Sequence, residues 1–201
     1  MPKAPLRILI VAVLCTLSLI GLVVRESMAR ASGTEVLLAM EAVDPRSLLS
    51  GHFVIVGLRE ELTEGGFPCS TQYADAEWLG LAPNGRTVAA APVFSLVAES
   101  TSSRGAEGAP GSVAVRGVYT CAPPQPPTSD FAGAPGWIDL DLGINRFHIN
   151  QTEAERIDQM LREQTSGEEQ RIFAIVSIGE DGRARLKGLM IDGERLELNW
   201  L

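Results

Sequence analysis

The sequence predicts a mainly β (α+β) protein: an antiparallel β-rich ectodomain with one amphipathic helix, preceded by a single N-terminal transmembrane helix. Three observations predict this architecture. Residues 8–24 form an uncharged apolar run near the N-terminus. Most of the remaining chain alternates short β-branched or apolar segments with turns rich in Gly, Pro and Asp, which is the pattern of strands. Only the segment after residue 150 repeats its apolar residues at helical spacing.

The apolar run predicts a membrane anchor. Its 17 residues are at the short end of what spans a bilayer, and Arg7 and Arg25 extend it because their aliphatic stems reach along apolar surface. A cleaved signal peptide is the alternative, with Ala29-Arg30-Ala31 as its small-x-small site. The length of the run and the charges before that site favour an uncleaved anchor. We therefore divide the chain into an anchor with its flank, residues 1–30, and an extracytoplasmic domain, residues 31–201.

The charges that flank the run predict its orientation. Basic residues lie on both sides, so the positive-inside rule favours a cytoplasmic N-terminus by a small margin. Translocation of the long acidic C-terminal part agrees with that orientation. The expected location is the inner (cytoplasmic) membrane, with a single pass and with the body in the periplasm.

The body is acidic, which limits its partners. The whole chain has a net charge of −8, and without residues 1–30 it keeps 13 basic and 24 acidic side chains, a net charge of −11. Nucleic acid requires a positive face for its phosphates, so we expect no nucleic-acid partner. The charge also argues against a body that lies flat on anionic lipid. The oligomeric state stays open.

The three cysteines fall into two groups. Cys15 lies in the apolar run, whereas Cys69 and Cys121 are the two cysteines of the body. An even pair in an oxidising compartment predicts a disulfide between Cys69 and Cys121. The alternative is two buried thiols.

After a short stalk, residues 25–34, the first two expected strands are 35–43 and 52–60. Both are apolar-rich, and the second is β-branched and aromatic. Residues 44–47 form the turn between them, because Pro45 stops a helix and Asp44 can hydrogen-bond the backbone.

The middle of the chain predicts an antiparallel ribbon made of strands 87–99 and 112–121. Residues 100–112 would be its long, mobile loop, since small, polar and Gly residues cannot pack a core. A second mobile loop, 121–136, is rich in Pro and Gly; the alternative is a polyproline II segment that binds a partner.

One amphipathic helix is expected near the C-terminus. Thr152 and Glu155 fit a capping box at its start, and Gly167 fits its end. Ile157 and Leu161 fall on one face, which we expect to cover a sheet.

Strands surround this helix, and the last three form a meander. The expected ranges are 137–142, 144–149, 171–178, 184–191 and 194–200. The meander has two hairpin turns, 179–182 and 192–193, of the kind that requires positive φ.

A membrane-anchored serine–lysine peptidase-like hydrolase is one alternative function. Ser47 or Ser50 would be the nucleophile and Lys187 the base, since the other lysine, Lys3, precedes the anchor. Neither serine has the Ser-Met context expected there. Lys187 has the flanking residues expected of a lysine that points outward from a strand.

A metal- or small-molecule-binding sensor domain is the other alternative. Asp139 and Asp141 alternate along a strand and so share a face, and His148 is near in sequence. The structural interpretation is a solvated polar face and two surface histidines, His52 and His148. The sequence has no Gly-rich phosphate loop, HExxH or CxxC pair. We expect no enzyme activity, cofactor or metal.

The stretch VDPRSLLSGHFVIVGL, residues 43–58, resembles the signature of the bacterial GDYXXLXY family, whose usual form is close to VDPRDLLRGDYVxLxY. Gly51 is kept and His52 replaces the acid. Phe53, Val56 and Leu58 keep apolar character but lose both tyrosine hydroxyls. Residues 142–149 are similar to the family's G-I-E-R-Y/F segment, and residues 181–193 are similar to its closing hairpin.

This resemblance implies a membrane-anchored protein of a family without an established activity. The family's reading frames are often adjacent to multi-pass membrane proteins of unknown function. The resemblance therefore implies a non-enzymatic accessory ectodomain beside an integral membrane partner, and its motif has the pattern of a buried corner and strand.

Overall fold

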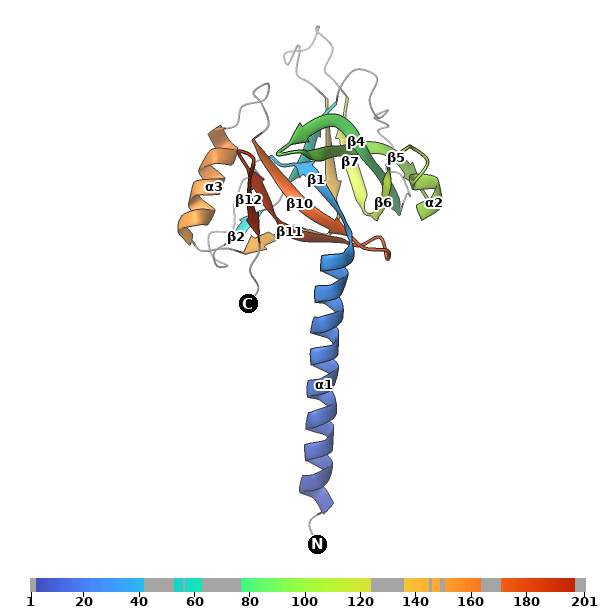
Figure 1. Cartoon of the computed structure of the whole chain (residues 1–201), viewed down its shortest axis with the longest axis vertical. Coiled ribbons are helices and arrows are strands. Elements are labelled where there is room, and N and C mark those ends of the chain that lie inside the picture. Colours follow the sequence, from blue (N-terminus) through green and yellow to red (C-terminus); the bar gives the residue numbers. More distant parts are fainter. Residues whose placement is uncertain are drawn as a thin grey trace.

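The computed structural model describes residues 3–41, 53–55, 57–62, 77–123, 136–144, 146–148, 151–163 and 171–197. Helix α1 (Lys3–Ser32) projects from a β-rich body (Figure 1). Pro5 lies in its first turn, where a missing backbone N–H leaves no intrahelical hydrogen bond unmade. The segment Ile8–Ser32 is long and apolar enough to cross a membrane. The expected N-terminal helix is therefore present as a candidate single-pass anchor.

A seven-stranded sheet is the largest element of the body. Its strands are β1 (Thr34–Ala39), β4 (Trp78–Val88), β5 (Ala91–Ser100), β6 (Val113–Arg116), β10 (Ile172–Ile178), β11 (Ala184–Ile191) and β12 (Glu194–Glu197). The strand order is β12-β11-β10-β1-β5-β4-β6. All neighbours are antiparallel except β1 and β5, which are parallel. The predicted antiparallel, mainly β body is confirmed.

Strands β1 and β10 lie in the middle of this sheet and are covered on both faces. Val36 and Leu38 of β1 face the main core, and Leu37 between them joins a smaller apolar cluster on the other face. Leu37 is opposite Ile175 of β10, and all seven residues of β10 are buried. A nearly continuous apolar run, interrupted in β10 by Ser177, is the pattern expected for such a strand.

The described residues also form two smaller sheets. Strands β3 (Leu58–Glu61), β8 (Trp137–Asp141) and β7 (Val118–Ala122) form one in that order, and β2 (Phe53–Ile55) pairs with β9 (Arg146–His148) in the other. Leu58 and Ile138 join the main core that the large sheet also lines. The prediction of one strand over 52–60 is wrong, because the chain changes sheets near Gly57, whose carbonyl accepts a hydrogen bond from Glu41 N.

The ribbon predicted for the middle of the chain is also wrong. Strand 87–99 is interrupted by a tight turn at Ala89 and Ala90, both with positive φ. The residues before this turn form β4, which pairs with β5 on one side and β6 on the other. Strand β4 was missed because Pro83-Asn84-Gly85 has the composition of a turn. The register shifts there, between Pro83 and Thr87, so the strand accommodates these residues as an irregularity.

A short helix, α2 (Ser103–Ala106), lies within the segment expected to be an irregular loop, 100–112. The Ser102 hydroxyl accepts a hydrogen bond from Gly105 N and caps the helix. Ala106 is fully buried, and its carbonyl leaves no room for a Cβ on Gly80 of β4. This segment therefore does contribute to the core. Residues 124–135 of the second expected loop lie outside the described residues.

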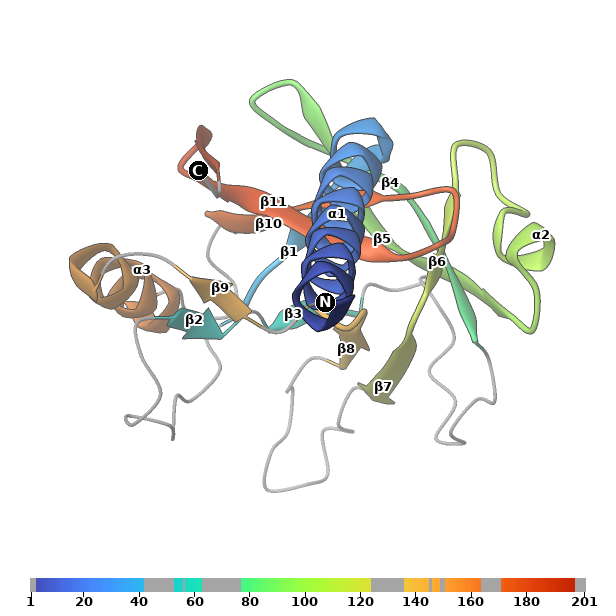
Figure 2. The ribbon, with the colours of Figure 1, turned by 90° about the horizontal axis from the view of Figure 1, so that it is seen from below.

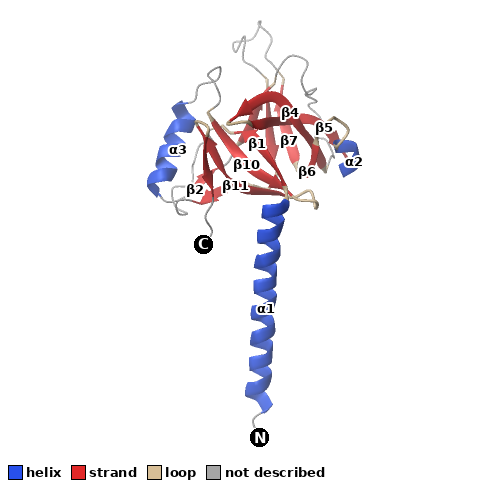
Figure 3. Cartoon of the chain, in the orientation of Figure 1, coloured by secondary structure: helices blue, strands red, loops and turns tan. Residues whose placement is uncertain are grey.

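The expected amphipathic helix is α3 (Gln151–Glu163), which begins one residue before the predicted cap, Thr152. Ile157 and Leu161 are buried in the main core, as its apolar spacing predicts. The predicted end at Gly167 lies outside the described residues. Figure 3 shows α3 beside the strands that make up most of the body.

The C-terminal meander is confirmed over its described residues, with β10, β11 and β12 paired in sequence order. In its turns Gly182 has a φ of 72°, Asp192 of 51° and Gly193 of 82°. These are the positive values that the two turns were expected to need.

Candidate functional site at the helix–body junction

The last turns of α1 lie directly against β10 and β11. Gly33 connects α1 to β1, and a Cβ at this position would collide with the Ser177 hydroxyl and with the carbonyl of Ile178. Figure 2, seen from the side on which α1 leaves the body, shows β10 and β11 behind the helix. The chain therefore passes from helix to strand without a spacer.

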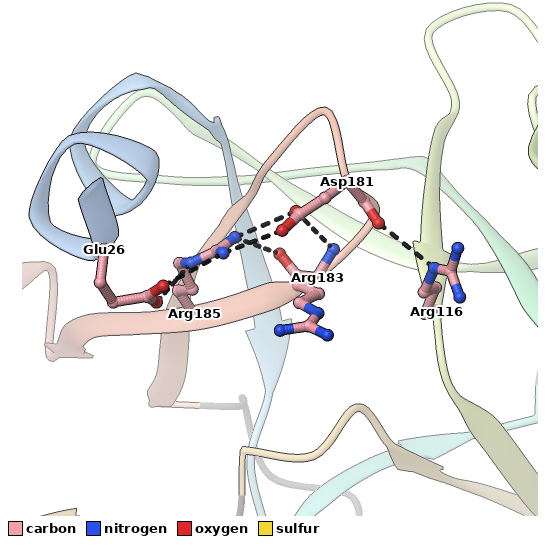
Figure 4. Close-up of polar contacts among 5 residues, drawn as sticks. All are labelled: Glu26, Arg116, Asp181, Arg183 and Arg185. Carbon is pink, nitrogen blue, oxygen red and sulfur yellow. Dashed lines mark hydrogen bonds and ion pairs between the residues drawn. The ribbon is translucent and has the colours of Figure 1, made fainter. Parts of the chain in front are cut away.

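Arg185 of β11 joins the helix to the body. Its Nε lies 2.6 Å from Glu26 Oε1 on α1, and its Nη2 donates to Asp181 Oδ2 at 3.0 Å (Figure 4). The Arg185 side chain is only 9% exposed, whereas the side chains of Glu26 and Asp181 are 64% and 44% exposed. A nearly buried guanidinium is thus neutralised on both sides by carboxylates that keep contact with water.

These ion pairs shift the pKa values of the body residues involved. Hydrogen bonds from Arg185 lower the pKa of Asp181 to about 2. Asp181 and then Glu26 raise the pKa of the Arg185 guanidinium. Both groups are therefore charged near neutral pH.

A second set of contacts lies further along β11. Arg30 Nη2 of α1 donates to the backbone carbonyl of Lys187 at 3.1 Å. The Lys187 ammonium pairs with Glu35 Oε2 at 3.0 Å, and Arg195 of β12 pairs with Glu35 Oε1 at 2.6 Å. Hydrogen bonds from Arg195 and Lys187 lower the pKa of Glu35. Residues of α1, β1, β11 and β12 are thereby tied together where the helix enters the sheet.

The β10–β11 turn is fixed on its other side by Arg116 of β6. Arg116 N donates to the Gly182 carbonyl at 2.7 Å, and its Nε donates to the Asp181 carbonyl at 3.3 Å. The guanidinium also stacks on Trp78, 4.6 Å from the ring centroid. Trp78 in turn occupies the space that a Cβ on Gly182 would need. The turn is therefore held between α1 and the β4–β6 edge.

The junction is suited to holding two elements in one orientation. Its carboxylates and guanidiniums are paired with one another by charge-assisted hydrogen bonds, which fix the positions of their side chains. Lys187, the predicted base of a serine–lysine pair, is one of these paired ions. The two serines proposed with it, Ser47 and Ser50, lie outside the described residues.

The family-motif residues are described only in part. Gly51, His52 and Val56 lie outside the described residues. Phe53 begins β2 and is opposite His148, and Leu58 is buried in the main core. The described part of the motif therefore lies on two short strands, β2 and β3, and has no reactive side chain.

The three residues of the predicted metal or ligand site lie on different sheets. Asp139 and Asp141 are on β8, whereas His148 is on β9, which pairs with β2. Asp139 accepts hydrogen bonds from Arg59 Nε and Nη2 at 2.6 and 2.9 Å. Asp141 Oδ1 accepts one from Gly143 N at 3.0 Å.

Arg59, which directly follows the family motif, forms an ion-paired cluster away from the junction. Its Nε also lies 2.9 Å from Glu41 Oε2, and its guanidinium stacks on Trp137 at 4.7 Å from the ring centroid. The hydrogen bonds with Asp139 raise the pKa of Arg59. This cluster joins β3 to β8 and to Glu41, which lies two residues after β1.

Of the predicted disulfide, only Cys121 lies in the described part of the chain. It lies one residue before the end of strand β7, opposite Ile138 of β8, and is half-buried. Cys69 lies outside the described residues, so the bond stays a prediction. Cys15 is a free, exposed cysteine on α1.

The junction residues were not found from the sequence. Two signals were present: Glu26 is the single acidic residue among the first 30, and Arg185 and Lys187 alternate on a predicted strand. The pairing itself joins positions 159 residues apart, which local sequence patterns do not reveal.

Comparison with known proteins gives one match. A family model described as "GDYXXLXY protein" matches residues 15–189, which covers most of α1, the motif region and most of the closing hairpin. Searches of curated proteins and of solved structures gave no match.

Proposed function

The chain belongs to the GDYXXLXY family, and we propose that it is a membrane-anchored extracytoplasmic domain that serves as a non-enzymatic accessory or binding partner of a multi-pass integral membrane protein. In this proposal residues 1–30 are the anchor and its flank, and residues 31–201 are the binding domain. The N-terminus is cytoplasmic and the body is periplasmic, in the inner membrane of a bacterium.

The observation that carries the proposal is the contrast between the two ends of α1. The large apolar side chains between Ile8 and Val24 are about half or more exposed, with Ile8 at 70%. The last two turns are instead tied to the body through Glu26 and Arg30. An apolar helix with this exposure requires lipid or other apolar helices around it. A body fixed to such a helix is held at a set orientation beside whatever the helix contacts.

The periplasmic location leads us to propose the disulfide between Cys69 and Cys121 as well. It would close a loop of roughly 53 residues and contribute about 4 kcal/mol through the entropy of the unfolded chain. Thiol titration of the denatured protein tests it. One thiol, that of Cys15, should react before reduction and all three cysteines after it; three reactive thiols without reduction would exclude the bond.

In-cell crosslinking of the tagged full-length protein tests the proposed partner. A photo-crosslinking amino acid is placed in turn at Leu14, Leu17 and Leu22, all exposed on α1, and captured proteins are identified by mass spectrometry. A matched crosslinker at Arg104, on α2 of the body, is the positional control. A second control replaces residues 1–30 by a cleavable signal peptide.

We expect at least one α1 position to capture a single multi-pass membrane protein, and we expect this capture to disappear in the signal-peptide variant. Capture of no specific protein from any α1 position would contradict a partner that contacts the anchor. Capture that persists without the anchor would show that the partner binds the body.

A further inference from the structure

The position of the Glu26–Arg185 pair fixes the level of the body relative to the apolar run. The run ends at Val24, and Glu26 follows two residues later, about 3 Å further along the helix axis. The headgroup layer on each side of a bilayer is roughly 5–7 Å thick. If α1 spans a membrane, as the proposed function requires, β11 and the β10–β11 turn therefore lie at the level of the lipid headgroups.

Three guanidiniums lie at this level. Arg25 is exposed on α1, next to Glu26, and Arg183 is exposed in the β10–β11 turn. Neither side chain has an ion pair or hydrogen bond with any residue in the described ranges. In Figure 4 the Arg183 guanidinium points away from Arg185 and Asp181. The third, Arg116, stacks on Trp78 and uses its Nε for the Asp181 carbonyl.

The local charge is the opposite of that of the body. Residues 31–201 have a net charge of −11, yet the five residues drawn in Figure 4 carry three arginines and two carboxylates. Arg25 adds another positive charge, and the exposed Glu180 of the same turn offsets one. A tryptophan beside arginines is also the composition typical of protein surfaces at a membrane interface.

We infer that Arg25, Arg183 and Arg116 form a rim that binds the phosphates of anionic phospholipid headgroups. The inference rests on the proposed function for one point, that α1 is a membrane anchor. Guanidiniums bind phosphate oxygens by paired hydrogen bonds, and Arg183 and Arg25 have their donors available for this. The rim would hold the underside of the body on the leaflet around α1, while the acidic remainder stays away from it.

Full-length protein reconstituted in phosphatidylcholine vesicles tests the rim. The association of spin-labelled phosphatidylglycerol is compared with that of spin-labelled phosphatidylcholine by electron paramagnetic resonance. The test variant is R25Q/R183Q. The control is R104Q, which removes one positive charge from an exposed residue of α2. The variant E180Q removes the opposing carboxylate from the same turn.

We expect the wild-type protein to prefer phosphatidylglycerol. In R25Q/R183Q this preference should fall about fivefold, or disappear where the wild-type preference is itself less than fivefold. R104Q should keep the preference and E180Q should increase it. All four side chains are exposed, so thermal unfolding should be unchanged in each variant. Equal lipid selectivity in the wild-type protein and R25Q/R183Q, or no rise in E180Q, would overturn the inference.

The outcome is independent of the partner protein. If the wild-type protein floats with the vesicles but shows no lipid preference, the rim is excluded and the anchor stands. If it does not float with the vesicles, the anchor fails, and with it the proposed function.

Discussion

At the scale of single residues, Arg185 organises the junction. It is nearly buried on β11 and binds one carboxylate from the anchor helix and one from its own hairpin. The pKa of Asp181 is lowered from its ordinary value of 3.8 to about 2. A carboxyl whose pKa falls on folding stabilises the folded state above its ordinary pKa and loses that contribution as the pH falls toward the folded value. The Asp181 contribution is therefore complete at neutral pH and is lost between about pH 4 and pH 2.

Replacing Arg185 by Met should lower the free energy of unfolding by about 1–2 kcal/mol at neutral pH. The loss is limited because both carboxylates are half-exposed and can be hydrated once the guanidinium is gone. Thermal unfolding in detergent, combined with a double-mutant cycle with E26Q, measures the coupling between helix and body. R183M is the matched control, because Arg183 is two residues away and exposed; equal losses in R185M and R183M would contradict the role of the pair.

Glu60 on β3 gives a prediction with a defined pH dependence. Burial raises its pKa above 4.5, although hydrogen bonds from the Ser95 hydroxyl and from Leu96 N oppose the shift. A carboxyl whose pKa rises on folding reduces stability as the pH increases through that interval. E60Q should therefore raise the melting temperature at pH 7, and this gain should disappear below about pH 4, where Glu60 is protonated in both states.

The sign of this pH dependence is checked by measuring the melting temperature of E60Q across this pH range. The control is E61Q, at the exposed neighbouring residue. A gain that is the same at pH 4 and pH 7 would show that Glu60 acts through packing and that its charge is irrelevant.

At the scale of elements, the sequence predicted the helices and strands whose sequence pattern is local. The meander was predictable because Gly182, Asp192 and Gly193 mark turns that few residues can form, and α3 because Ile157 and Leu161 keep helical spacing. Strand β4 could not be predicted, since its Pro-Asn-Gly segment is tolerated only through an irregular register with β5. The division of 52–60 into β2 and β3 was equally hidden. It depends on which strands lie alongside, and this is decided by long-range packing.

Gly182 tests the packing of the β10–β11 turn. Its φ of 72° disfavours any side chain, and a Cβ would meet the Trp78 ring. Gly193, in the next turn, has a similar φ of 82° but open space around it. G193A should cost about 1 kcal/mol from backbone strain alone, and G182A should cost about 1–3 kcal/mol more because Trp78 must move. Chemical unfolding of both variants compares them, and equal costs would mean that Trp78 does not hold this turn.

At the scale of the whole molecule, the structure is a β-rich body attached without a linker to one exposed apolar helix. The sequence indicated both parts and the family, because hydropathy and a motif are local features. It did not indicate that the two parts are joined by ions from α1, β1, β11 and β12, since these residues are separated by up to 160 positions. The junction is the feature that makes the anchor part of the structure of the body.

The claim on which the functional proposals depend is that α1 remains attached as an anchor and that the body lies outside the cytoplasm. Protease treatment of spheroplasts, followed by mass spectrometry of the membrane fraction, tests both parts in one measurement. The predicted result is a chain in the membrane that still contains residues 1–30 before treatment, and loss of the body to external protease afterwards. A shortened chain released into the periplasm would contradict the anchor, and a body protected from external protease would contradict the orientation.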